Sequence, residues 1–233
     1  KIGADVRDLD KDLAKARGKF KSFGRTMKTV GRNMSMSITA PLAAVAGSSF
    51  KVAMDFEASM AKVKAVSGAT AEEFGRLEAQ AKLLGKSTVF TASDVASLQT
   101  EFAKLGFTAQ EIDKVTESTL YLAQATGSDL GQAAEVAGAT LRGFGMDASE
   151  TGRVTDVMAK SFSTSALDMD SFADSMKYVG PVAKAAGLSI EDTTAMLGTL
   201  ANAGIKGSAA GTALRRILAD MGTEGGPVTE QIA

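Results

Sequence analysis

A short glycine-led segment occurs four times in the chain, and its spacing constrains the fold more than any other feature. The segments are GATAEE, GFTAQE, GMDASE and GLSIED, which begin 38, 39 and 42 residues apart at Gly68, Gly106, Gly145 and Gly187. A glycine can end one helix in the left-handed conformation, and a polar residue two positions later can cap the next helix. The capping residues are Thr70, Thr108, Asp147 and Ser189. Three residues after each comes an acid that favours the helix dipole, and that completes a capping box where it is Glu: Glu73, Glu111, Glu150 and Asp192.

A second series of candidate helix starts lies between these segments. Its members are 35, 40 and 40 residues apart: Ser93, Ser128, Asp168 and Ser208. Apolar residues follow at helical spacing, for example Leu214, Ile217, Leu218 and Met221. Repeats of about 40 residues that contain two helices predict an array of glycine-capped helical hairpins. Because the helix bodies match one another poorly, a regular solenoid and an irregular helical domain both remain open.

The first 40 residues carry a different pattern, an apolar heptad seam. Its members are separated alternately by three and four residues: Val6, Leu9, Leu13, Ala16, Phe20, Phe23, Met27, Val30 and Met34. Four heptads predict a long amphipathic helix that forms a left-handed coiled coil. The two phenylalanines favour a trimer or a larger homo-oligomer over a dimer. Packing of this helix on the hairpins of its own chain is the alternative.

The face opposite the seam is basic. Residues 1–40 hold 10 Lys and Arg against 4 Asp and Glu, and the remainder holds 16 against 23. The basic face consists of Arg7, Lys11, Lys15, Lys21, Arg25, Lys28 and Arg32. It suits non-specific contact with an acidic protein surface or with DNA phosphates, and no aromatic residue lies on it to stack on a base. A merely solvated face is the alternative.

Composition narrows the chemistry. The chain has no Cys, no His and no Trp, which excludes disulfides, thiol or imidazole catalysis and nearly every zinc, haem or iron–sulfur site. We therefore expect no enzyme, no catalytic, cofactor-binding or metal-binding residue, and no cofactor. With 27 acidic residues, composition alone does not exclude catalysis by a pair of carboxylates, as in lysozyme-like enzymes.

These patterns divide the chain into four parts. We expect a basic heptad helix over residues 1–40, an amphipathic connecting helix over 41–67, a helical-hairpin domain over 68–222, and a linker to a further C-terminal part over 223–233. Residues 33–50 carry no charge, but their hydroxyl groups, Pro41 and Gly47 argue against a membrane span. With only three Pro and two Tyr among many Ala and Gly, the fold class is all-α.

Four long segments, in this order, resemble the core of the phage tail tape-measure proteins, also called phage minor tail proteins. They are ITAPLAAVAGSSFKVAMDFEASMAKVKAVSG (38–68), AKLLGKSTVFTASDVASLQTEFAKLGF (81–107), LAQATGSDLGQAAEVAGATLRGFGMD (122–147) and YVGPVAKAAGLSIEDTTAMLGTLANAGIKGSAAGTALRRIL (178–218). None of them is a catalytic signature.

The resemblance implies a structural protein of the virion that lies in the lumen of the phage tail. Such a protein templates tail length and tail assembly in the host cytoplasm, and it leaves with the DNA during infection. The implied partners are tail tube subunits and distal tail or baseplate proteins, with non-specific DNA contact and transient membrane contact as further expectations. A non-catalytic helical scaffold or adaptor, and a membrane-active helical module that aids DNA passage, are the alternatives.

Overall fold

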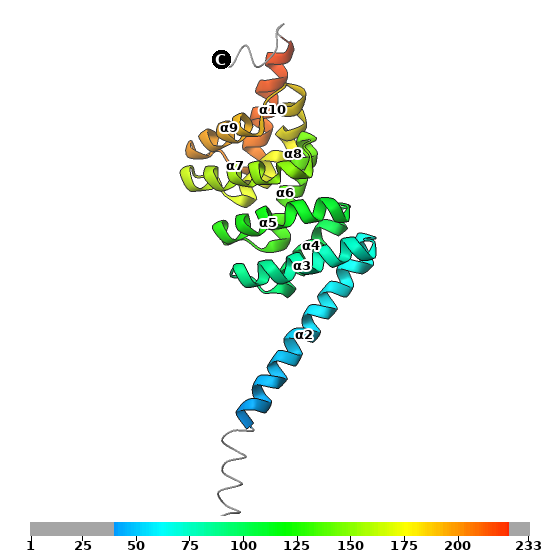
Figure 1. Ribbon diagram of the computed structural model, residues 1–233. Helices are drawn as coiled ribbons and strands as arrows, with labels where there is room; N and C mark the ends of the chain where they lie inside the picture. Colours follow the sequence, from blue (N-terminus) through cyan, green and yellow to red (C-terminus); the bar gives the residue numbers. More distant parts are fainter. Residues whose placement is uncertain (1–39, 224–233) are drawn as a thin grey trace, which may run out of the picture. The chain divides into compact units, whose positions relative to one another are not determined.

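The computed structural model describes residues 40–223, and the side chains of residues 50–222 within that range. Between residues 40 and 223 all regular structure is helical, with nine α-helices, one short 3-10 helix and no strand (Figure 1). The predicted all-α class is therefore confirmed. The helices are α2 (Ala40–Ser67), α3 (Ala71–Ser87), α4 (Ala92–Lys104), α5 (Ala109–Thr126), α6 (Leu130–Phe144), η2 (Ala148–Glu150), α7 (Thr151–Thr164), α8 (Met169–Ala185), α9 (Ile190–Asn202) and α10 (Gly207–Thr223).

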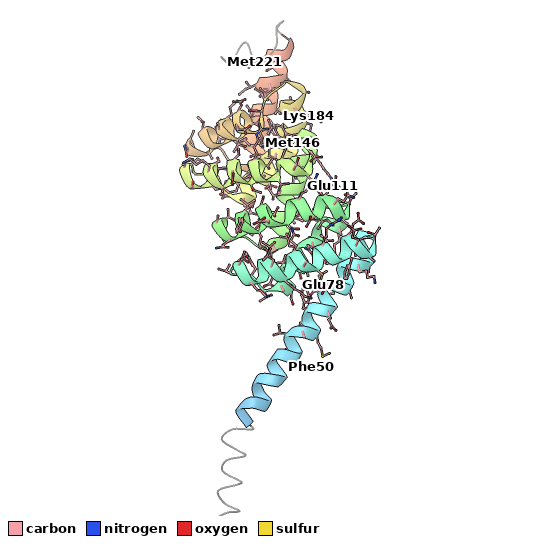
Figure 2. All side chains as sticks on the ribbon, in the orientation of Figure 1. Phe50, Glu78, Glu111, Met146, Lys184 and Met221 are labelled. Atoms are coloured by element: carbon pink, nitrogen blue, oxygen red, sulfur yellow. The ribbon has the colours of Figure 1, made fainter. Side chains whose placement is uncertain are left out.

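Compact packing divides the chain into two units, residues 1–55 and residues 56–233, so the boundary falls inside α2. In the first unit the structure describes α2 from Ala40 onward, with the side chain of Phe50 exposed (Figure 2). In the second unit Met60 and Val63 are buried. None of the helices within residues 40–223 combines the length and apolarity that crossing a membrane requires.

Helices of the second unit pack in two successions (Figure 1). α3, α5, α7 and α9 contact one another in that order, and α4, α6, α8 and α10 do the same. Neighbours in the chain, such as α3 with α4 and α5 with α6, join the two successions. Their shared core holds large, fully buried side chains that include Leu77, Phe102, Ile112, Leu141, Met158, Phe172 and Leu197.

The helix caps explain where most of these helices begin. The glycines that lead the four repeated segments all have positive φ, between 62° and 81°. Full capping boxes start α3 at Thr70, α5 at Thr108 and α9 at Ser189, with Glu73, Glu111 and Asp192 as the reciprocal partners. Glu111 lies in the first turn of α5 (Figure 2).

The third repeated segment departs from that scheme. Asp147 caps the short helix η2 by accepting from the backbone N–H of Ser149 at 2.8 Å. Glu150 closes no box. It pairs instead with Arg153, whose Nη1 lies 3.1 Å from a carboxylate oxygen of Glu150. The aspartate satisfies the first amides within a tighter turn, so α7 starts at Thr151 without a side-chain cap.

In the second series of helix starts, the prediction of Asp168 is confirmed, because its carboxylate accepts from the backbone N–H of Ser171 at 2.8 Å. Two other predicted positions are wrong by one or two residues. Thr91 replaces Ser93, since Thr91 forms a box with Asp94. Asp129 replaces Ser128, since its carboxylate accepts from the N–H groups of Gly131 and Gln132.

One predicted apolar position is also wrong. Ile217 of α10 is 49% exposed, whereas Leu214 and Leu218 on the same helix are buried. The buried face of α10 centres on Gly211, Leu214 and Leu218, where the helix meets α8, and Ile217 falls at its edge.

Candidate interaction surface

The residues predicted as an oligomer seam and as a basic face all lie between positions 6 and 34, outside the described residues. Their roles therefore stay predictions. The described part of the chain adds surfaces of its own, and one of them lies on the second succession of helices, between α6 and α8.

A polar contact between α7 and α9, two stacked helices of the first succession, helps to fix their relative position. Arg153 of α7 donates to both carboxylate oxygens of Glu191 in α9, at 2.6 and 2.8 Å. These hydrogen bonds lower the pKa of Glu191 and raise the pKa of Arg153. Arg153 lies in the first turn of α7 and Glu191 in the first turn of α9, so the bond joins the starts of two stacked helices. A planar guanidinium that bonds in this bidentate way also orients the helices that carry it.

Side-chain hydrogen bonds also connect α3, α4 and α5. Nε2 of Gln99, a fully buried residue of α4, donates to the carbonyl oxygen of Leu77 and to Oε1 of Gln80, both at 3.0 Å. Gln80 in turn donates to the carbonyl oxygen of Asp113 at 2.6 Å. One chain of hydrogen bonds therefore runs from α4 through α3 to α5.

The groove between α6 and α8, which we call the α6/α8 groove, has a volume of about 450 Å³. Its floor is apolar, with Val136 and Ala139 from α6 and Ala173, Met176 and Pro181 from α8. The small side chains of Ala139 and Ala173 leave room above this floor for side chains from outside.

Charged residues form the rim of the α6/α8 groove. The acids are Glu135 on α6 and Asp170 and Asp174 on α8, and the base is Lys177. Lys177 Nζ lies 3.0 Å from Asp174 Oδ1. That contact, assisted by the charge of Glu135, raises the pKa of Lys177 and keeps it protonated. With one base against three acids, the rim carries a net charge of about −2 at neutral pH.

Pro181 lies inside α8 and lines the groove. Because proline has no backbone N–H, position 181 cannot donate the usual helical hydrogen bond to the carbonyl oxygen of Lys177, four residues earlier.

A second hollow, of about 490 Å³, continues the groove toward the start of α8. The two hollows share Gln132 and Asp170, whose side chains are hydrogen-bonded to each other. The second hollow adds the apolar residues Phe162 and Leu167 and the carboxylate of Asp168. The backbone N–H of Ser171 and the ammonium group of Lys206 lower the pKa of Asp168.

The chemistry of this surface suits binding. Within residues 40–223 no three His, Cys, Asp or Glu residues gather in a way that would hold a metal ion. The grooves combine an apolar floor with carboxylates on their rims, which suits a positively charged, partly apolar partner.

Sequence reasoning missed the α6/α8 groove. Glu135 is 35 residues from Asp170, and the packing of two helices brings them to one surface. The local sign available was the pair Asp170 and Asp174, four residues apart and therefore on one side of a helix, beside the apolar Ala173 and Met176.

Comparisons with known proteins place the chain in a family. The family profile described as "Phage-related minor tail protein" matches residues 78–232. The "Tape measure protein" of Pneumococcus phage Dp-1 is 41% identical over 200 residues, which are 85% of this chain and 17% of that protein. The "Probable tape measure protein" of Escherichia phage P2 is 34% identical over 166 residues, 70% of this chain and 20% of that protein.

No solved structure matches the chain. The chain spans about a fifth or less of the length of these two relatives. The profile nevertheless covers more than half of the chain, and both relatives carry the same designation. The resemblance noted in the sequence is therefore confirmed: the chain belongs to the phage-related minor tail proteins, the family of the phage tail tape-measure proteins.

Proposed function

We propose that this chain is part of a structural tape-measure protein that lies in the lumen of a phage tail and templates tail length and assembly. The observation that carries the proposal is the 41% identity with a tape measure protein over 85% of the chain. The protein assembles with tail tube subunits and distal tail or baseplate proteins in the host cytoplasm. It then leaves the tail with the DNA during infection, with non-specific DNA contact and transient membrane contact on the way.

Within that protein, the helical domain from α3 to α10 acts as a folded module and not as part of the ruler. A ruler of extended helix contributes about 1.5 Å of length per residue. Helices that pack back on one another, as α3 to α10 do, contribute far less. This packing supports a role in starting or ending assembly, with the ruling segment elsewhere in the parent chain.

Tail length in phage particles tests this assignment. Deletion of residues 70–222 from the parent gene shortens an extended ruler by about 230 Å, at about 1.5 Å per residue. We expect no such proportional shortening, and tails shortened by that amount would contradict the module. If the deletion prevents assembly, duplication of residues 109–147, one repeat, provides a second test. An extended ruler would lengthen the tail by about 58 Å, whereas a folded module would not.

Self-association is the second part of the proposal. The seam from Val6 to Met34 joins copies into a trimer or larger homo-oligomer through a coiled coil. Light scattering on the full 233-residue chain measures its mass directly. The chain should be a defined oligomer, and Leu13→Lys with Phe20→Lys should reduce it to a monomer. A monomeric unmodified chain would exclude self-association through the seam.

A further inference from the structure

We infer that the α6/α8 groove is the docking surface for the basic face of the N-terminal helix of a second copy of this chain. The basic face is the set of seven residues defined above, from Arg7 to Arg32. The inference rests on the proposed function in one respect, because it assumes that the seam joins copies of the chain.

Charge complementarity is the first reason. The rim of the groove holds Glu135, Asp170 and Asp174 against the single base Lys177, which pairs with Asp174 and leaves an excess of two acids. Residues 1–40 carry six more basic than acidic residues, and residues 41–233 carry seven more acidic than basic residues. Opposite charges on the two parts steer one part of a copy toward the other part of its neighbour.

Spacing is the second reason. Asp170 and Asp174 are four residues apart on α8, which separates them by about 6 Å along the helix axis. Pairs of the basic face, such as Lys21 with Arg25 and Lys28 with Arg32, have the same spacing. Two helices that lie along each other can therefore place successive cations opposite successive carboxylates.

The apolar floor is the third reason. Lysine and arginine carry three or four methylene groups below the charged end, and they bury these stems on apolar surface while the charge stays at the rim. Val136, Ala139 and Met176 provide that surface. A purely acidic, flat surface would attract the same cations without taking their stems.

We assign a second copy as the occupant because the seam of the N-terminal helix joins copies of the chain while its basic face stays uncovered. Apolar seam residues are covered when copies join, which turns the basic face outward. A neighbouring copy in the same assembly then presents its acid-rimmed groove to this face at a high effective concentration.

Cross-linking of the full chain tests the docking, since the 233 residues contain no cysteine that would interfere. One preparation carries Ala139→Cys, at an exposed position on the groove, and the other carries Arg25→Cys on the basic face. The two are mixed and treated with a short bismaleimide, and the cross-linked peptides are identified by mass spectrometry. The matched control is Ala195→Cys, an exposed alanine on α9 outside the groove.

The expected product joins position 139 of one copy to position 25 of another, in a yield at least about tenfold above the control, by the order-of-magnitude effect of complementary charge. Replacing Asp170 and Asp174 by Lys should lower that yield by about tenfold, because like charges then face each other. Asp170→Asn with Asp174→Asn should lower it less. Two results would overturn the docking. One is an equal yield of the cross-link to position 25 from positions 139 and 195, and the other is a yield that does not change when Asp170 and Asp174 are replaced.

Two further readouts separate the docking from the proposed function. If light scattering shows an oligomer but no link from position 139 forms, the docking is wrong and self-association stands. If the chain is a monomer and no link forms, both are wrong. The double variant Ala139→Cys with Arg25→Cys reports docking within one chain, and a link found only there, at the mass of a single chain, would overturn the second copy as occupant.

Discussion

The backbone of Ser175 in α8 lies so close to Gly211 in α10 that a β-carbon at position 211 would stand 2.4 Å from the Ser175 carbonyl oxygen. The Ser175 hydroxyl also donates to the carbonyl oxygen of Gly207, one turn earlier in α10, at 2.8 Å. The two helices therefore meet backbone to backbone.

Gly211→Ala should destabilise the domain by about 1–3 kcal/mol, because the added methyl group forces the two backbones apart. Urea unfolding followed by circular dichroism measures this loss. Gly75→Ala is the matched control, since Gly75 is exposed inside α3 and a β-carbon there meets nothing within 4 Å. That change should be neutral or stabilising by up to about 1 kcal/mol. Equal effects at the two positions would contradict the close packing.

Gln99→Ala should cost about 2–4 kcal/mol, because it leaves a cavity and removes the hydrogen bonds that join α4 to α3. Gln99→Met keeps most of the side-chain volume and should cost less. Chemical denaturation of both variants gives the comparison. Should Gln99→Ala prove no worse than Gln99→Met, the buried volume of this side chain would not matter to stability.

Thr108→Ala should cost about 1 kcal/mol, because it removes the hydroxyl that caps α5 by accepting from the N–H of Glu111. Thr108→Ser keeps a capping hydroxyl and should cost a few tenths of that amount at most. Thermal unfolding distinguishes the two. A loss of the same size for serine would mean that the methyl group, and not the cap, stabilises this turn.

Acid should destabilise the domain through its carboxylates. The pKa of Glu191 is lowered by hydrogen bonds from Arg153, and the pKa of Asp168 is lowered chiefly by the N–H of Ser171. A lowered folded-state pKa means that the unfolded chain binds protons first. The stabilisation is present above the unfolded-state values of about 4 and is lost as the pH falls through the folded-state values.

Urea midpoints measured from pH 7 down to pH 2 should therefore decrease, most steeply below about pH 4. Glu191→Gln should make this decrease shallower, and Arg153→Gln should do the same because it removes the partner. The double variant should add little to either single change. Additive effects would show that the contact with Arg153 does not cause the pH dependence contributed by Glu191.

The helix starts were predictable from sequence because a cap is local. Thr70 and Glu73 determine the first turn of α3 from within four residues, and the same holds for Thr108 with Glu111. Errors arose where two capping residues compete nearby. Thr91 with Asp94 forms a reciprocal pair that Ser93 does not form.

The α6/α8 groove was not predictable, because its rim depends on which helices pack together. Glu135 and Asp170 become neighbours only through the contact of α6 with α8, and no local pattern specifies that contact. The exposure of Ile217 has a similar origin. α10 buries the face that contains Gly211, because only glycine allows so close an approach to the backbone of Ser175. The spacing of the apolar residues does not show which face is buried.

The helices from α3 to α10 make their main contacts with elements that are near them in chain order. Each substantial contact joins elements at most two helices apart, and no such contact spans the whole domain. In a stack of this kind the free energy of unfolding is approximately a sum of two sets of contributions, those of the single repeats and those of the interfaces between neighbouring repeats. Tension applied at one end loads only the terminal pair of helices. Pulling on the domain should therefore open it one repeat at a time, with each step opposed mainly by the interface to the next repeat.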